Sequence, residues 1–186
     1  MITITLKGRE IPLLFTTWEM KEIQEEVGPM AETIARLIGR NKDDETDTSR
    51  YGGADQLATV GKAIRILGNA GLEEAGQEAD LTDKWVLRAM KPSETIDMVN
   101  KIMDAFNEGM LSEIPAKTEE GPVDVTLEEL KKKKREGRLT YLMVVSWGLI
   151  AGLTVPEINH MKPGQVMDLY IYRRNYDDVM HWIRRE

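Results

Sequence analysis

The side chains that most often carry out chemistry are few and scattered in this sequence. It contains two histidines, His160 and His181, and no cysteine. Metal sites require several ligands at short fixed spacings, such as the pattern His-Glu-x-x-His on a helix. Neither histidine has a ligand partner at such a spacing, so we expect structural or surface roles for both, with no bound metal and no cofactor.

The acidic residues and the glycines also form no familiar catalytic or ligand-binding motif. Residues 41–53 hold several carboxylates, but they lack the alternating ligands, the central glycine and the final glutamate of a calcium loop. Gly52 and Gly53 are not followed by the Lys-Ser/Thr pair of a phosphate-binding loop. Ser146 lies inside an apolar run rather than in a strand-to-helix elbow. The sequence therefore predicts a protein that is not an enzyme.

Composition indicates an acidic, soluble globular protein. The 186 residues carry a net charge of −7, and 41% of them are hydrophobic. An acidic surface repels phosphate backbones, so nucleic acid is not the expected partner. Residues 1–10 lack the basic region and the apolar core of a signal peptide. The longest apolar stretch, residues 142–153, is shorter than the roughly 20 residues that span a bilayer, and we interpret it as a buried helix. We therefore expect a cytoplasmic protein with no membrane partner.

Hydrophobic periodicity predicts an α+β fold that is mostly α-helical, with an N-terminal β-hairpin followed by about seven helices. Residues 2–6 alternate apolar and polar side chains, and residues 11–15 form a second apolar run in which Pro12 marks an edge or irregular strand. Capping boxes, in which a glutamate follows a threonine by three positions, start helices after Thr16, Thr126 and Thr154. Helical signals fall on residues 16–27, 30–38, 55–68, 82–90, 93–109, 126–137, 140–153, 155–161 and 163–182.

The pattern also predicts where these helices begin, end and bury their side chains. Residues 41–53 and 69–80 are polar or rich in small residues, and we expect them to be connections. Ser93 is expected to cap the next helix. The buried stripe of that helix would consist of Ile96, Val99, Met103 and Phe106. Pro163 is suited to be the first residue of the last helix, in which any break is expected near residues 175–178.

One stretch divides the chain. Residues 112–124 contain Pro115, Gly121, Pro122 and several charges, which is typical of a linker. We therefore expect an N-terminal hairpin plus helical domain over residues 1–111 and a C-terminal helical region over residues 125–186.

Residues 154–174 contain two short helical phrases around a Pro-Gly turn, which suggests a DNA-reading helix-turn-helix. The second helix, however, is apolar on several sides and has only Arg173 and Arg174 as basic residues. The five cations of residues 131–135 follow two glutamates and fit a solvated helix end. A helical DNA-binding or regulatory protein using residues 131–135 and 154–174 remains the alternative interpretation. A small enzyme without a local signature is a third.

Methionine and aromatic residues are concentrated in the C-terminal region. Flexible thioethers fill gaps in cores, and they also suit surfaces that accept varied apolar partners. Both interpretations stay open for this cluster. The candidate partner-binding residues are Trp147, Met161, Pro163, Met167, Tyr170, Tyr172 and Tyr176.

Two segments carry a family resemblance. The first is the hairpin ITITLKGREIPLLFTT followed by the helix WEMKEIQEEVG, within residues 1–39. The second is LTYLMVVSWGLIAGLTVPEINHMKPGQVMDLYIYRRNY, residues 139–176. In these segments the chain resembles the tail assembly chaperones of long-tailed bacteriophages. In that family a Pro-Gly-Glu-like phrase opens the last helix. Here Lys162-Pro163-Gly164-Gln165 stands at that place, with Lys and Gln departing from the commoner Thr and Glu.

The resemblance implies a function. Such chaperones coat the long, apolar tape-measure protein, keep it soluble in the host cell cytoplasm and recruit tail-tube subunits. The resemblance therefore implies a tape-measure protein and a tail-tube protein as partners, homo-oligomer formation and no cofactor. The second segment resembles the C-terminal extension of the longer product, which is made by ribosomal frameshifting. Lys131 to Lys134 would be encoded by an adenine-rich stretch on which a ribosome can slip, which suggests the join between the two forms. Continuous translation without slippage is an equal alternative.

Overall fold

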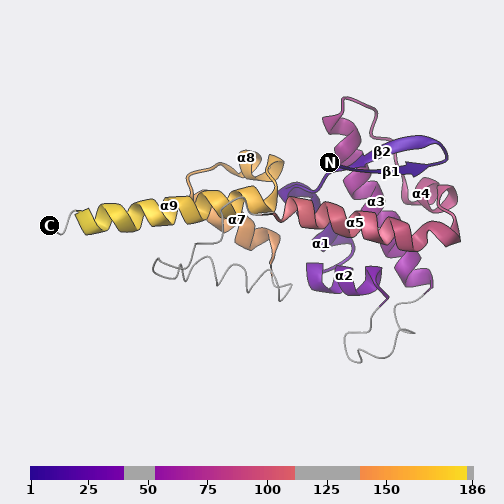
Figure 1. Ribbon diagram of the computed structural model, residues 1–186, viewed down its shortest axis with the longest axis horizontal. Helices are drawn as coiled ribbons and strands as arrows, with labels where there is room; N and C mark the ends of the chain where they lie inside the picture. Colours follow the sequence, from indigo (N-terminus) through magenta and orange to yellow (C-terminus); the bar gives the residue numbers. More distant parts are fainter. Residues whose placement is uncertain (40–52, 112–138, 184–186) are drawn as a thin grey trace.

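A computed structural model of the protein describes residues 1–39, 53–111 and 139–183, with side chains as far as residue 174. Within these residues, a two-stranded antiparallel sheet is followed by eight α-helices and one 3₁₀ turn (Figure 1). The expected α+β, mostly helical fold is confirmed. The linker at residues 112–124, the helix at 126–137, the cations at 131–135 and most of the loop at 41–53 lie outside the described residues.

The chain opens with the expected β-hairpin, formed by β1 (Ile2–Leu6) and β2 (Arg9–Leu13). Lys7 and Gly8 connect the strands, and both have positive φ angles, of 49° and 79°. Two successive left-handed residues are typical of the tight turn whose twist matches that of the strands. The alternating side chains of the hairpin then bury one face, which consists of Ile4, Leu6, Ile11 and Leu13.

The central element of the N-terminal part is α3 (Ala54–Glu74), a helix of 21 residues. It packs against β2 and against four other helices: α1 (Thr17–Glu26), α2 (Met30–Leu37), α4 (Asp83–Ala89) and α5 (Thr95–Gly109). The prediction that residues 69–80 form a connection is wrong for the first part of that stretch. Helix α3 continues because Leu72 is fully buried and Gly71 lies directly under the hairpin, where an added Cβ would be 2.1 Å from the carbonyl oxygen of Pro12.

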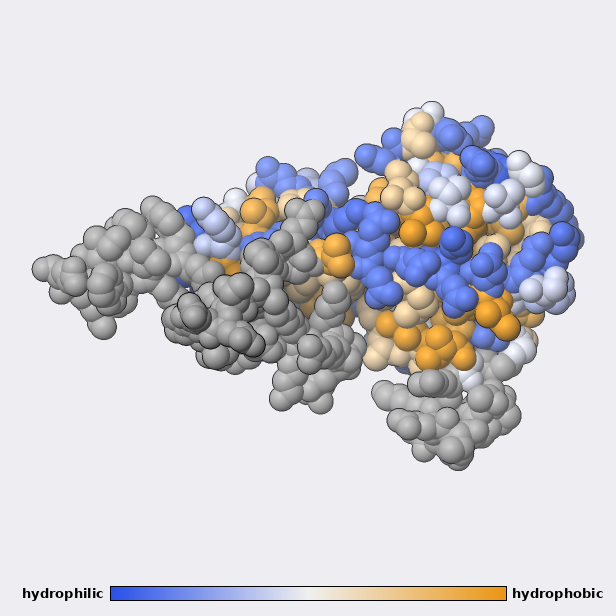
Figure 2. Space-filling view, viewed as in Figure 1, coloured by the Kyte–Doolittle hydropathy of each residue, from blue (hydrophilic) through white to orange (hydrophobic). Residues whose placement is uncertain are grey.

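Helix α5 differs from its prediction in its start and in its buried side. A 3₁₀ turn at η1 (Pro92–Glu94) precedes it, so Ser93 does not cap the helix. Val99 and Phe106 are buried as expected, but Ile96 is 76% exposed and Met103 is only partly buried. The buried side is completed instead by Met98, Ile102 and Ala105, because α5 packs against α3 and β1. Figure 2 shows hydrophilic residues over the outer side of α5.

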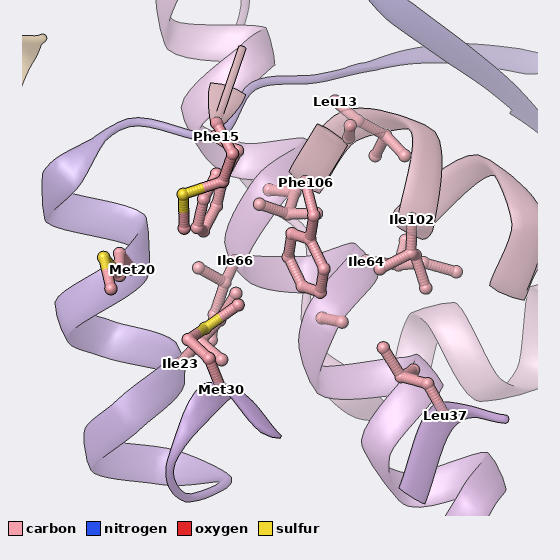
Figure 3. Packing of buried hydrophobic residues seen from close by; sticks show 14 of the residues in the cluster. Leu13, Phe15, Met20, Ile23, Met30, Leu37, Ile64, Ile66, Ile102 and Phe106 are labelled. Atoms are coloured by element: carbon pink, nitrogen blue, oxygen red, sulfur yellow. The ribbon is translucent and has the colours of Figure 1, made fainter. Parts of the chain in front are cut away.

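The buried side chains form one continuous hydrophobic cluster. Phe15 follows the hairpin and meets Phe106 of α5, with ring centroids 4.9 Å apart (Figure 3). Around this pair lie buried aliphatic and methionine side chains from α1, α2, α3 and α5, among them Met20, Ile23, Met30, Leu37, Ile64 and Ile102.

The C-terminal part consists of α7 (Tyr141–Ile150), α8 (Val155–His160) and α9 (Pro163–Ile183). Pro163 begins α9 as predicted, whereas the break expected near residues 175–178 does not occur, because α9 is continuous to Ile183. Figure 1 shows these three helices together at one end of the molecule, with the C-terminal half of α9 extending beyond the others. No helix in the described ranges combines the length and the apolar character that crossing a membrane requires.

The C-terminal helices pack on the N-terminal part through hydrogen bonds as well as apolar contacts. The side-chain amide of Gln24 donates to the carbonyl of Leu139 at 3.3 Å, and its oxygen accepts from the backbone N–H of Tyr141 at 3.1 Å. Helices α7 and α8 both contact α1. Buried residues of α7, α8 and α9 also belong to the same hydrophobic cluster as the N-terminal core.

Candidate partner-binding surface

Local sequence signals set the ends of α7 and the start of α8. The hydroxyl of Thr140 caps α7 by accepting from the backbone N–H of Met143. At the other end, Gly152 has a φ of 93°, and the N–H of Leu153 returns to the carbonyl of Gly148 at 2.9 Å. This is the glycine-terminated arrangement in which the last carbonyls of a helix are satisfied. Thr154 then forms the predicted capping box and starts α8.

One side of α7 is packed against α8 and α9. Its Gly148 allows close approach, since an added Cβ would lie 2.5 Å from the side chain of Ile158 and 3.3 Å from that of Val166. At the neighbouring position, the ring of Trp147 stacks on that of Tyr170, with centroids 5.9 Å apart and an interplanar angle of 23°. The turn at Pro163 therefore folds α9 back against α7.

Six of the seven candidate residues have described side chains, and these six fall into three groups by burial. Trp147, Met167 and Tyr170 are at most 8% exposed, and Pro163 is also buried. Met161 is partly buried and packs on the core. Tyr172 is 74% exposed, whereas the side chain of Tyr176 lies outside the described residues. The structure thus brings five of the candidates together inside the chain's own packing and leaves Tyr172 facing solvent.

The other side of α7 is exposed and, apart from Ser146, apolar. Leu142, Leu149 and Ile150 are 72%, 52% and 58% exposed, and Val145 is half-buried between them. Leu142, Val145 and Leu149 follow one another at steps of three and four residues, so they line one face of the helix. We call these four residues the α7 stripe. The prediction of a buried helix at residues 142–153 is therefore wrong for this face.

The α7 stripe was missed because its sequence has almost no polar side. A helix that is hydrophobic all round is normally buried, and Ser146 is the one polar residue of α7 after its first position. Which side of such a helix is covered depends on its neighbours, which the local sequence does not specify.

Helix α9 also has two exposed apolar residues. Leu169 and Tyr172 are three positions apart and are 40% and 74% exposed. In the part of α9 whose side chains are described, residues 163–174, the exposed basic residues are Arg173 and Arg174. The helix-turn-helix interpretation remains a prediction, because the cations at residues 131–135 lie outside the described part.

Two carboxylates at the junction with the N-terminal part have shifted pKa values. Burial raises the pKa of Glu19, although hydrogen bonds from Thr16 partly oppose the shift. The opposite shift occurs at Glu108, whose pKa is lowered chiefly by a hydrogen bond from the ammonium of Lys162 at 2.7 Å. The chain's α-amino group lies 3.4 Å from the same carboxylate. Both carboxylates have hydrogen-bond partners that hold local structure together. In the described part of the chain, neither is paired with a base as the acid of a catalytic site would be.

Among the residues that the structure describes, no three His, Asp or Glu side chains come together as a metal site would require. Comparisons with protein-family models, with curated proteins and with solved structures found no match to this chain. The interpretation of the surface therefore depends on its own chemistry.

Proposed function

We propose that this protein is a non-enzymatic tail assembly chaperone of a long-tailed bacteriophage. In this proposal it acts in the host cell cytoplasm, binds the tape-measure protein, keeps that protein soluble and recruits tail-tube subunits. The observation that carries the proposal is the α7 stripe: a row of aliphatic side chains, more than half exposed at three of its four positions. The sequence resemblance in residues 1–39 and 139–176 supports it independently.

The stripe suits a helical apolar partner. Contiguous exposed apolar side chains on a soluble protein commonly mark an interaction site. Anchors at steps of three and four residues are the spacing by which one helix packs against another. Covering a leucine or isoleucine side chain stabilises a complex by roughly 1.5–3 kcal/mol when burial is complete. Several such anchors would give useful affinity without a specific sequence in the partner, which is what coating a long repetitive helix requires.

The net charge and the surface of the protein are suited to keeping a bound apolar partner in solution. A chaperone must keep its apolar client in solution, and a net charge of −7 opposes aggregation of the complex. In Figure 2, a band of hydrophilic residues covers the outer side of α5, beside smaller hydrophobic areas.

Co-expression tests the proposal. The tape-measure protein encoded with this chain should be insoluble alone, and soluble and bound to this chain when both are produced. A tape-measure protein that stays insoluble, or that is soluble without binding this chain, would contradict the proposal.

A further inference from the structure

An open groove of about 620 Å³ lies where the start of α1, the end of α3 and α8 meet. Its volume is in the range of ligand-binding clefts. It shares no residue with the α7 stripe, so an inference from it does not depend on the proposed function. Leu14 and Ala70 contribute apolar surface from the N-terminal part, and Val155 and Pro156 contribute it from α8.

An exposed tryptophan forms the rim of this groove. Trp18 is 41% exposed, and its indole N–H donates to the carboxylate of Glu22 at 2.9 Å. The ammonium of Lys21 lies 4.6 Å from the ring centroid. These two contacts fix the orientation of the ring before any partner arrives, which lowers the entropic cost of binding. Val155, 40% exposed, provides a second apolar contact on the side of α8.

Carboxylates predominate among the charged groups of the groove, with the ammonium of Lys21 over the ring of Trp18 at its rim. The acidic residues that line it, among those that the structure describes, are Glu19, Glu73 and Glu74, and the lining also includes His160. Glu73 and Glu74 end α3, and the last turn of that helix contains no basic residue. Negative side chains at a helix C-terminus are unfavourable, because the helix dipole is already negative there. Glu73 and Glu74 therefore lower the stability of α3 and attract cations into the groove.

We propose that this groove binds a basic amphipathic segment of a partner protein. Apolar side chains of that segment would lie against Trp18 and Val155, and its lysine or arginine side chains would face Glu73 and Glu74. Phosphate-bearing ligands are disfavoured by the carboxylates. A second copy of this chain is disfavoured as the occupant, because each copy carries a net charge of −7.

A binding measurement with the full-length protein tests this proposal. The probe is a fluorescein-labelled amphipathic helical peptide of lysine and leucine, and the readout is fluorescence anisotropy. A peptide with glutamate in place of lysine is the negative probe. Because two exposed ion pairs are lost, the double substitution Glu73→Gln/Glu74→Gln should weaken binding about fivefold. Trp18→Ala should weaken it about tenfold, since aromatic anchors carry a large share of binding energy.

The matched control is Asp97→Asn/Asp104→Asn, which removes the same charge from exposed positions on α5. We expect this control to bind the lysine peptide within about twofold of the wild type. Thermal melting should show Glu73→Gln/Glu74→Gln to be at least as stable as the wild type, so that weaker binding cannot come from unfolding.

Three results would overturn the proposal. The first is no binding of the lysine peptide. The second is an equal loss of binding in the α5 control, which would show general attraction to an acidic protein. The third is self-association of the wild type, measured by sedimentation, that Glu73→Gln/Glu74→Gln abolishes, because the groove would then hold a second copy.

Discussion

The backbone N–H and the hydroxyl of Thr17 both donate to the carbonyl of Met161, each at 2.9 Å. Thr17 is the first residue of α1 and is fully buried, and Met161 lies between α8 and α9. The hydroxyl of the preceding Thr16 also donates to the carbonyl of Asn159, at 2.8 Å. The start of α1 therefore holds the α8–α9 joint in one position. The C-terminal helices are fixed on the N-terminal part, which places the α7 stripe on a rigid support.

Thr17→Val tests this attachment. The substitution keeps the shape of the side chain and removes one donor, so it should lower the free energy of unfolding by about 1 kcal/mol. Hydrogen exchange should show increased opening of α8 and the start of α9, with α3 unchanged. Thr5→Val, at an exposed position of β1, is the matched control and should change neither quantity. Equal protection of α8 in Thr17→Val and wild type would contradict the role of this contact.

Gly164→Ala should disturb the second attachment, at the end of α5. An added Cβ would lie 2.1 Å from the carbonyl oxygen of Leu111, which is backbone and cannot rotate away. We expect the strain to lower the free energy of unfolding by about 1–3 kcal/mol, as in other overpacked sites. Differential scanning calorimetry should show a melting temperature lower by several degrees. An unchanged melting temperature would mean that α9 does not approach Leu111 this closely.

The Glu108–Lys162 ion pair should stabilise the protein only when Glu108 is ionised. Because the folded state lowers the pKa of Glu108 below its ordinary value of 4.5, the contribution is present above that value. It is lost as the pH falls through the lowered pKa. Glu108→Gln should therefore reduce the melting temperature slightly at neutral pH and not at all in strong acid. The effect should also shrink in high salt, since both side chains are about one-third exposed. A difference in melting temperature between Glu108→Gln and the wild type that does not depend on pH would contradict this role of the ion pair.

Glu19 should show the opposite pH dependence. Its pKa is raised in the folded state by burial, so folding favours the protonated carboxyl. The free energy of unfolding then loses a contribution as the pH rises from about 4.5 through the raised pKa. Glu19→Gln retains an oxygen that can accept from Thr16 and cannot ionise. Its stability relative to wild type should increase over this pH window, as measured by melting temperature. A constant difference across the window would show that Glu19 does not titrate there.

The sequence predicted the features that depend on neighbouring residues. The capping boxes at Thr16 and Thr154 were predicted and are present, because each is formed by side chains three positions apart. The hairpin and the start of α9 at Pro163 were predicted for the same reason.

The features that were mispredicted depend on contacts between distant segments. Helix α3 extends to Glu74 because Gly71 accommodates the strand at Pro12, a contact that glycine content alone does not indicate. The candidate surface was placed on aromatic and methionine residues, and Trp147 and Tyr170 instead stack on each other inside the fold. The exposed apolar residues of α7 are leucine and isoleucine, which the sequence alone does not distinguish from core residues.

We propose that the tape-measure protein docks on the α7 stripe. The double substitution Leu142→Gln/Leu149→Gln tests this claim most directly. Both side chains are more than half exposed, so the variant should fold with a melting temperature close to that of the wild type. Ile96→Gln/Leu111→Gln removes two similarly exposed aliphatic side chains from the N-terminal part and is the matched control. The measurement is the amount of soluble tape-measure protein that co-purifies with each variant. We expect a loss of about tenfold or more for the α7 variant and little change for the control. Full co-purification with the folded α7 variant would contradict the account.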